Sequence, residues 1–286
     1  EEAESMNSND DPGSTDPAAA APVPPASAAG LITGRRAMLL AAAGSAAAIA
    51  ALRAWPKLRT EEGYQPLLDV GDRLGRITQR ALMRRGSLAP EYRLDQVSAT
   101  FPSNGGIGAS YVDPNPDFQR LAATRFRDWR LSVGGLVQRP TRFSLDDLRA
   151  MPTRTQVTMH CCDEGWSAIG QWTGVPLGWL LNRVGLLASA RYIVFHALDR
   201  IGGVAVFDSI DLYDAFHAQT ILAHRFNGAE LPVGHGAPLR LRLELQIGYK
   251  NVKHLERIEA VDSLANVGGG HGGLFQQYGY QWYAGQ

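Results

Sequence analysis

Cys161 and Cys162 are the only two cysteines of the 286-residue chain, and they are neighbours in the segment 160–167, which reads HCCDEGWS. A thiolate suits a soft or high-valent metal, and a single protein ligand leaves coordination positions for a cofactor and a substrate oxygen. Free cysteines are also common as small buried residues, and a disulfide between neighbours would be strained and close almost no loop. A zinc or copper site made of His160 and both cysteines would be crowded by their adjacency. The glutamate, serine and tryptophan beside the pair favour a reactive or metal-ligating thiolate.

Basic residues recur downstream within a second set of motifs. Residues 226–232 read FNGAELP, residues 235–242 read HGAPLRLR, and residues 248–253 read GYKNVK. A fixed arginine fork, lysines and loop N–H groups are what the binding of a phosphate-bearing ligand requires. Each basic residue alone could be a solvated surface charge, but their order behind the cysteine segment favours an anion site.

Together these motifs resemble the sulfite-oxidase superfamily of molybdopterin enzymes, in particular the methionine sulfoxide reductase catalytic subunit-like branch with its Cys-x-Glu-Gly/Ala-Trp-Ser pattern. The resemblance implies an α+β fold, with mixed sheets and surrounding helices, and a molybdenum–molybdopterin cofactor in the mononucleotide-free pterin form. The residues that it implies are Cys162 as catalytic thiolate and molybdenum ligand, His235 and Arg240 at the pterin, Asn251, Val252 and Lys253 around the phosphate, and Asn104 near the cofactor.

The same resemblance implies a molybdenum-dependent oxidoreductase that passes an oxygen atom to or from a small oxo substrate, such as a sulfoxide. Direction and substrate stay open, because sulfoxide reduction, sulfite oxidation and reduction of another oxo compound all fit. The sequence contains no Cys-x-x-Cys-His haem-attachment motif and no iron–sulfur cysteine set. Electrons must therefore pass through an external partner, for which we expect a haem protein.

Two residues depart from the family pattern and motivate an alternative function. Ala197 stands where relatives carry a threonine near the cofactor, and its side chain can form no hydrogen bond. Asp163 follows the expected metal ligand at a position where an apolar residue is commoner. A non-catalytic, metal-free binding protein that keeps the fold is the alternative. Asn104 begins an Asn-Gly-Gly run that is equally typical of a plain turn.

The front of the chain resembles an export signal. Arg35 and Arg36 precede an Ala- and Leu-rich run that ends at Leu52, which is a twin-arginine signal in outline and predicts a periplasmic protein. This run is shorter than the roughly 20 residues that span a bilayer, which favours removal after export, although an N-terminal membrane anchor also fits.

Periodicity predicts several elements of the remaining chain. Short β-branched and aromatic runs at 192–197 and 204–207 predict strands. Ser144, with Asp147 three residues later, predicts a capped helix start, and Pro176 predicts another, since the apolar residues after it have helical spacing. Strands interleaved with short helices agree with the α+β class.

Composition sets the domain boundaries that we expect. The 28 basic and 28 acidic residues balance, which argues against a nucleic-acid partner. We expect five segments along the chain: a disordered segment at 1–30, the twin-arginine signal or anchor at 31–55, a helical linker region at 56–98, the molybdopterin-binding domain at 99–265, and a flexible Gly-rich connector with an aromatic tail at 266–286.

Overall fold

The computed structural model describes residues 86–286 except 104, 108, 110 and 111, together with residues 70, 71, 74, 75, 77, 78 and 81. Residues Gln65–Gln286 form one unit of the chain. The segments 1–30 and 31–55, with the arginine pair, and Asn104 lie outside the described residues. Within the described part, no helix has both the length and the apolar character needed to cross a membrane.

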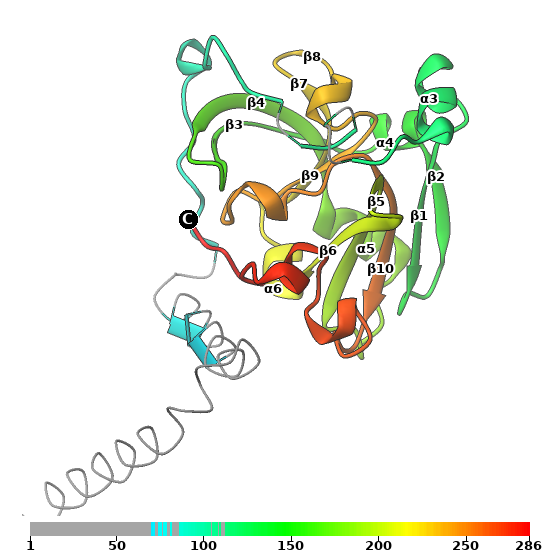
Figure 1. The fold of residues 1–286 in the computed structure, drawn as a ribbon. Coiled ribbons are helices and arrows are strands. Elements are labelled where there is room, and N and C mark those ends of the chain that lie inside the picture. The colour runs from blue at the N-terminus through cyan, green and yellow to red at the C-terminus, as the bar shows by residue number, and fades with distance from the viewer. Residues whose placement is uncertain are drawn as a thin grey trace, which may run out of the picture. The chain divides into compact units, whose positions relative to one another are not determined.

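One five-stranded sheet consists, in spatial order, of β2 (Thr141–Ser144), β1 (Arg130–Gly135), β10 (Leu255–Val261), β5 (Tyr192–Ile201) and β6 (Val204–Asp211). β1 pairs with β10 in parallel, and the other neighbours are antiparallel. In β1 the buried Leu131 and Val133 alternate with more exposed residues, as expected of a strand with one face on a core. Both predicted strands lie within β5 and β6 (Figure 1).

The second sheet is antiparallel throughout and consists of β3 (Arg154–Cys161), β4 (Ser167–Pro176), β7 (Ile221–Phe226), β8 (Ala229–Glu230) and β9 (Arg240–Arg242), with β8 and β9 both paired to β7. β3 and β4 form a hairpin in which Cys161 pairs with Ser167. Residues 162–166, called the cysteine loop below, therefore lie at the tip of this hairpin.

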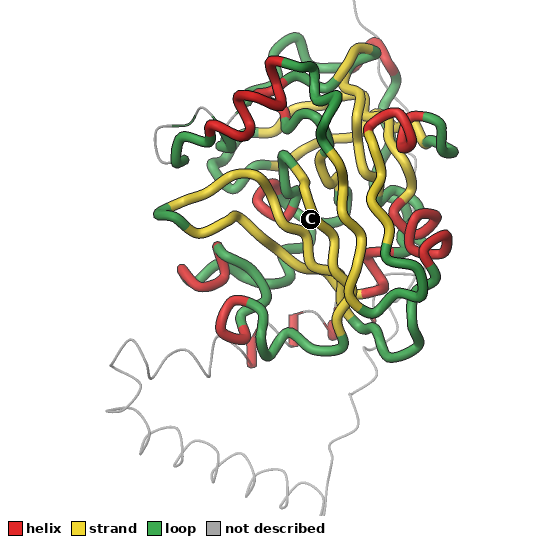
Figure 2. The backbone as a smooth tube through the Cα atoms, turned by 90° about the vertical axis from the view of Figure 1, so that its right-hand side faces the viewer, coloured by secondary structure: helices red, strands yellow, loops and turns green. Residues whose placement is uncertain are grey.

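Short helices surround the strands (Figure 2). They are the α-helices α3 (Pro116–Ala123), α4 (Leu145–Arg149), α5 (Leu177–Val184) and α6 (Leu212–Ala215), and the 3₁₀ turns η2 (Leu94–Gln96), η3 (Val233–His235), η4 (Gly248–Lys250), η5 (Gly268–Gly270) and η6 (Phe275–Tyr278).

Both predicted helix starts are confirmed. The Asp147 N–H donates to Ser144 Oγ at 3.0 Å, and the Ser144 N–H donates back to Asp147 Oδ2 at 2.8 Å, which forms a capping box at the start of α4. α5 begins directly after Pro176, and its apolar residues at helical spacing are all buried.

The main hydrophobic core lies between the two sheets and under α5. Leu131, Phe195 and Ile258 contribute from one sheet, and Leu222 and Leu241 from the other. All are nearly or fully buried, so each sheet covers the apolar face of its partner. The α+β architecture that the motifs imply is confirmed.

Residues 86–98 differ from the helical linker that we expected. The described residues between 70 and 81 are helical, but residues 87–98 are extended apart from η2. Glu91 forms a β-bridge with Thr158, and the Tyr92 N–H donates to Val157 O at 2.8 Å. This stretch therefore adds to the edge of β3, a long-range pairing that local periodicity does not reveal.

The C-terminal segment 266–286 also differs from expectation, because its glycines form hydrogen-bonded turns and its aromatic residues pack. Ser209 Oγ donates to Gly272 O at 2.5 Å, and Trp282 Nε1 donates to Ser209 Oγ at 2.8 Å. The Ile247 N–H donates to Ala284 O at 2.9 Å. These bonds hold the segment against β6 and against the chain just before η4.

A buried ion pair lies beneath this segment. Lys250 and Asp208 have side chains that are 0% and 2% exposed and form a salt bridge. Lys250 Nζ also donates to Ser209 O at 3.0 Å and lies over the Trp282 ring, 5.5 Å from its centroid. Gln276 Nε2 donates to the second carboxylate oxygen of Asp208 at 3.2 Å. Burial raises the pKa of Asp208, and Lys250 opposes that rise.

We expect Lys250→Met to lower the free energy of unfolding by about 3–5 kcal/mol, because it leaves the Asp208 carboxylate buried without its cation. The double variant Lys250→Met/Asp208→Asn should lose clearly less, since no unpaired charge remains. Urea unfolding of the cofactor-free protein measures both. Arg257→Met, which breaks a partly exposed pair with Glu259, is the matched control and should cost about 1 kcal/mol or less. Equal losses in the single and double variants would contradict the assignment.

Candidate active site

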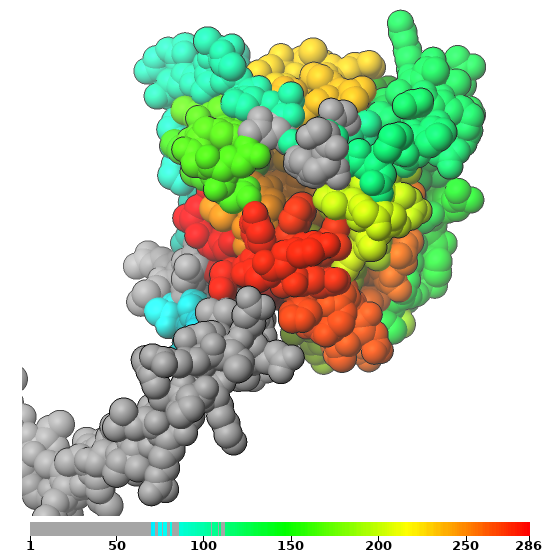
Figure 3. All heavy atoms as spheres, in the orientation of Figure 1, coloured from blue at the N-terminus to red at the C-terminus, as the bar shows by residue number. Residues whose placement is uncertain are grey.

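A cavity of about 350 Å³ lies where distant segments of the chain meet. Its lining comes mainly from residues 101–106, from the hairpin residues 160–166, from 199–208, from 235–253 and from 275–280. Figure 3 shows the cysteine loop, the β5–β6 region and the red C-terminal segment around a recess on one face of the molecule. The volume is within the range of small-molecule sites.

The cysteine loop turns tightly and presents Cys162 to this cavity. The Cys162 N–H donates to Trp166 O at 2.9 Å, and the Gly165 N–H donates to Cys162 O at 3.1 Å. Cys162 is a lining residue and Cys161 is not. Both are free thiols, so the structure distinguishes the two neighbours by position.

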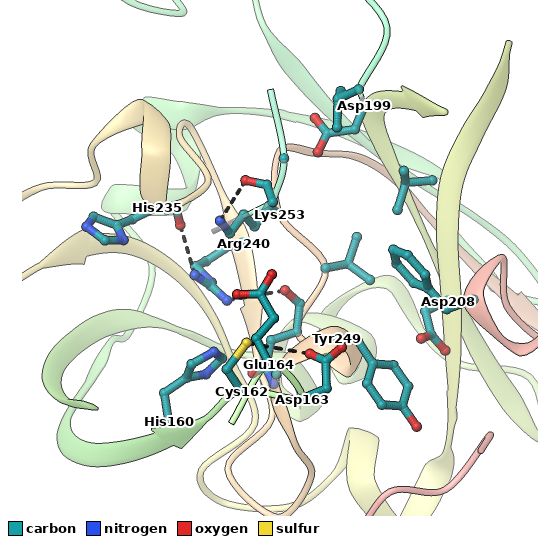
Figure 4. Close-up of a pocket in the computed structure, with 18 of the residues that line it drawn as sticks. His160, Cys162, Asp163, Glu164, Asp199, Asp208, His235, Arg240, Tyr249 and Lys253 are labelled. Atoms are coloured by element: carbon teal, nitrogen blue, oxygen red, sulfur yellow. Dashed lines mark hydrogen bonds between the residues drawn. The ribbon is translucent and has the colours of Figure 1, made fainter. Parts of the chain in front are cut away.

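The Cys162 thiol carries its proton in this state. Burial raises its pKa to about 11, and the nearby Asp163 carboxylate contributes to the rise. Cys162 Sγ donates to Asp163 Oδ1 at 3.5 Å (Figure 4). A metal that binds this sulfur has to displace that proton, since the thiolate is the ligand form.

His160, at the base of the loop, is held as a neutral imidazole. Arg242 Nη1 lies 2.8 Å from His160 Nδ1, and because an arginine can only donate, Nδ1 accepts and the ring proton is on Nε2. Burial lowers the pKa of His160, and the charge of Arg242 lowers it further. Glu244 balances Arg242 through two hydrogen bonds of 3.0 and 2.7 Å.

Arg240 is the buried cation of the cavity wall. Its side chain donates to the carbonyl oxygens of His235 at 3.0 Å, Asn251 at 3.3 Å and Leu241 at 3.4 Å. Its guanidinium carbon lies 4.9 Å from the centroid of the Trp172 ring. Among the described residues no carboxylate lies at salt-bridge distance from Arg240, and burial lowers its pKa. The guanidinium is therefore placed to attract an anion.

Lys253 brings a second cation to the same side of the cavity. Its Nζ donates to Gly234 O at 2.9 Å and Gly105 O at 3.1 Å. Burial lowers its pKa to about 7, with Arg240 adding to the effect. Figure 4 shows Arg240 and Lys253 near one another and across the cavity from Asp163.

Of the other sequence-predicted residues, Asn251, Val252 and His235 line the cavity, but not all as direct donors, and Asn104 lies outside the described residues. The Asn251 side chain accepts from the Leu243 N–H at 2.8 Å and donates to Ile247 O at 3.1 Å, and its own N–H donates to Gly248 O. Asn251 therefore shapes the loop, and Val252 lines the cavity beside it. His235 packs against Phe226, and burial lowers its pKa to about 4, so the ring is neutral at pH 7.

Glycines allow these loops to approach one another. A Cβ atom at Gly248 would lie 3.1 Å from His160 Nε2 and 3.2 Å from the Cα of Cys162, so the start of η4 packs directly on the cysteine loop. Gly236 has a φ of +108°, and a Cβ atom there would lie 3.1 Å from Cβ of both Arg240 and Lys253. The cysteine loop and the motif at residues 248–253 are therefore in close contact along their backbones.

Asp199 is a cavity residue that sequence reasoning missed. It is 4% exposed, and its Oδ1 has no hydrogen-bond partner among the described residues. His254 Nδ1 donates to Ala237 O at 2.6 Å, so the Nε2 that faces Asp199 at 3.9 Å carries a lone pair and no proton. Burial raises the pKa of Asp199 to about 7. A carboxylate two residues after the run 192–197 was the signal in the sequence.

Irregular pairing explains how Asp199 reaches the cavity. The register of β5 against β6 shifts between His196 and Arg200, and such irregularities re-aim side chains. Ala197, by contrast, is 1% exposed, belongs to the main hydrophobic core and is not a lining residue. Its lack of a polar group therefore removes no donor from the lining. In the described part of the chain, no cluster of three or more His, Cys, Asp or Glu side chains could hold a metal ion by itself.

Comparisons with known proteins identify the family of the chain. Residues 119–266 match the family model "Oxidoreductase molybdopterin binding domain". A putative protein-methionine-sulfoxide reductase subunit YedZ1 from Azospira oryzae is 34% identical over 225 residues, 79% of this chain and 78% of the relative. A protein-methionine-sulfoxide reductase catalytic subunit MsrP from Xanthomonas axonopodis is 31% identical over 169 residues, 55% of this chain and 52% of the relative.

A solved structure is also similar, that of the sulfane dehydrogenase SoxCD from Paracoccus pantotrophus, with 24% identity and a TM-score of 0.44 over 48% of this chain and 39% of that one. The chain thus spans about half the length of the MsrP relative and less of the SoxCD chain. The family match contains the cysteine loop, Arg240 and Lys253. The chain therefore belongs to the molybdopterin-binding oxidoreductase family of the sulfite-oxidase type.

Proposed function

We propose that this chain is an exported oxidoreductase that reduces a sulfoxide or a similar oxo compound at a molybdenum centre ligated by Cys162. In this reaction the sulfur–oxygen bond breaks, the sulfur leaves as a thioether, and the oxygen leaves as water after two protons and two electrons are taken up. The observation that carries the proposal is the presence, in one cavity, of a thiol opposite a buried guanidinium and an ammonium group. The names of the relatives favour a sulfoxide as substrate.

The residues present fit a molybdenum–molybdopterin cofactor, for which we propose the mononucleotide-free form. Arg240 and Lys253 supply charged donors for phosphate oxygens, and Asp199 offers a buried acceptor for N–H groups of a pterin. Cys162 supplies the sulfur ligand. When bound, the cofactor provides the two-electron chemistry, and the protein provides position, electrostatics and access.

The side chains around the thiol have defined tasks in this proposal. Asp163 Oδ1 accepts a hydrogen bond from the Cys162 thiol. When a metal displaces the thiol proton, this carboxylate is therefore the nearest base that can take it up. The neutral His160 and the packed Gly248 hold the cysteine loop in place. Electrons come from an external one-electron donor, for which we propose a haem protein, since this chain has no haem-attachment motif.

Two sequence observations, Ala197 and Asp163, favoured the alternative of a metal-free binding protein with this fold. The position of Ala197 no longer supports it. Ala197 lies in the hydrophobic core and not in the lining, so its small side chain does not indicate lost chemistry. Asp163 remains a departure, and its carboxylate lies beside Cys162, where it adds negative charge.

Substitution of Cys162 by serine should abolish turnover and the sulfur-to-molybdenum charge-transfer absorption, because the hydroxyl is a poor substitute for a thiolate ligand. Cys161→Ser is the matched control and should keep both, since Cys161 does not line the cavity. Visible absorption and sulfoxide-dependent oxidation of reduced benzyl viologen measure the two properties. The opposite result, with Cys161 essential and Cys162 dispensable, would show that Cys161 is the metal ligand and would contradict the assignment of Cys162.

The variants Arg240→Ala and Lys253→Ala should purify with substoichiometric molybdopterin. A lost charge-assisted hydrogen bond costs about 1.5–3 kcal/mol, or roughly ten- to more than a hundredfold in affinity. Released pterin fluorescence and molybdenum analysis report the loading, and thermal unfolding should occur at lower temperature as ligand stabilisation is lost. Arg142→Ala, at an exposed position of β2, is the control and should load fully. Full loading of both cavity variants would show that these cations do not hold the cofactor.

We also propose that the protein is exported by the twin-arginine route, which suits a protein that folds around a bulky cofactor before crossing the membrane. Replacement of Arg35 and Arg36 by lysines should leave folded, cofactor-loaded protein in the cytoplasm, because the signal is read by its guanidinium pair. Cell fractionation with molybdenum analysis measures this, and Arg53→Lys is the control. Undiminished periplasmic protein in the pair variant would remove the export proposal.

A further inference from the structure

The sulfur side of the cavity is acidic. Asp163 and Glu164 directly follow Cys162, line the cavity and are exposed to solvent. Figure 4 shows Asp163 between Cys162 and Tyr249, with the Glu164 side chain directed into the cavity. Arg240 and Asp199, by contrast, are 2% and 4% exposed. The carboxylates that solvent reaches thus lie on the sulfur side, and Arg240 lies in the interior.

Aromatic side chains complete this side of the cavity. The ring centroids of Tyr249 and Tyr280 are 4.9 Å apart, those of Phe275 and Tyr280 are 5.7 Å apart, and all three residues line the cavity. Burial raises the pKa of the Tyr280 hydroxyl, and the nearby Asp163 carboxylate adds to the rise. We call these three residues together with Asp163 and Glu164 the acidic–aromatic entrance.

The C-terminal segment supplies two of these rings, and its anchoring fixes their position. Tyr249 Oη donates to Gln281 O at 2.6 Å, directly after Tyr280. Gln276, directly after Phe275, donates to the buried Asp208 at 3.2 Å. Tyr280 is 42% exposed, so the entrance presents an aromatic surface to solvent beside the Asp163 carboxylate.

Charge decides what this entrance accepts. An anionic phosphate on Arg240 and Lys253 would neutralise the cations of the cavity, as proposed above, and leave Asp163 and Glu164 as the charges that an incoming substrate meets. A carboxylate or sulfite anion at such a place is repelled, a cation is attracted, and a neutral thioether or sulfoxide packs on the rings.

We propose that Asp163 and Glu164 of the acidic–aromatic entrance are specificity-determining residues that select neutral and cationic organosulfur substrates against anionic ones, and that Tyr280 adds packing that does not depend on the charge of the substrate. This inference rests on the proposed function for the cofactor position, and it concerns charge selection independently of the direction of oxygen transfer.

The test uses the cofactor-loaded full chain and three thioethers that differ mainly in charge: methioninamide, N-acetylmethioninamide and N-acetylmethionine. At pH 6, below the usual α-amino pKa, they are cationic, neutral and anionic. Calorimetric dissociation constants should rise in that order, by about three- to tenfold per unit of charge. The spread should shrink at about 0.3 M salt.

Matched variants assign the effect to its residues. Asp163→Asn and Glu164→Gln should each reduce the ratio of the anion and cation dissociation constants, and the double variant should bring it close to one. Tyr280→Leu should weaken all three ligands by a similar factor and keep much of the ratio. Asp146→Asn, an exposed carboxylate of α4, is the control and should change nothing. Equal binding of the three ligands by the parent, or an unchanged ratio in the double variant, would overturn the inference.

Turnover separates this inference from the proposed function. The corresponding sulfoxides are assayed with reduced benzyl viologen as electron donor. Charge-ordered binding without reduction of any sulfoxide would reject the proposed reaction and keep the entrance assignment. Reduction at equal efficiency for all three charges, together with equal binding, would keep the reaction and reject the entrance assignment.

Discussion

Arg240 brings a positive charge into the protein interior without a carboxylate at salt-bridge distance among the described residues, and the structure around it tolerates that charge in specific ways. Three backbone carbonyls accept its hydrogen bonds, and the Trp172 ring lies under its guanidinium. The Arg242 guanidinium carbon also lies over the Trp172 ring, 4.5 Å from the centroid, but it is balanced by Glu244. Repulsion among Arg240, Arg242 and Lys253 is a cost that an anionic ligand removes. The repulsion among these three cations therefore couples folding to cofactor binding, because an anionic ligand that relieves it stabilises the folded protein.

Local signals in the sequence anticipated much of this site. The cysteine loop and the residues Arg240 and Lys253 are carried by short motifs, and the structure brings them into one cavity. The starts of α4 and α5 followed from Ser144 and Pro176, because capping and proline geometry act within a few residues. At Gly248 the backbone of the 248–253 motif lies against the cysteine loop. A glycine in a motif is consistent with a close contact of this kind, because it has no side chain.

Other features could not be read from the sequence, because they depend on pairing between distant segments. Asp199 reaches the cavity through an irregularity in the β5–β6 pairing. The tautomer of His160, with Nδ1 as acceptor, depends on Arg242, 82 residues away. Residues 87–98 have no pattern that distinguishes a strand added to β3 from a linker. The glycines of 268–273 suggest flexibility by composition, whereas Ser209 and Trp282 hold them in place.

The position of the C-terminal segment has a consequence for the order in which the site is completed. Both sheets are finished in the chain at Val261, the last residue of β10, whereas Phe275 and Tyr280 follow later. Since a ribosome makes the chain from its N-terminus, both layers and the cations of the cavity are synthesised before the aromatic wall. Phe275 and Tyr280 are thus the last cavity-lining residues to be synthesised, and the hydrogen bond from Ser209 to Gly272 joins their segment to a strand residue 63 positions earlier in the chain.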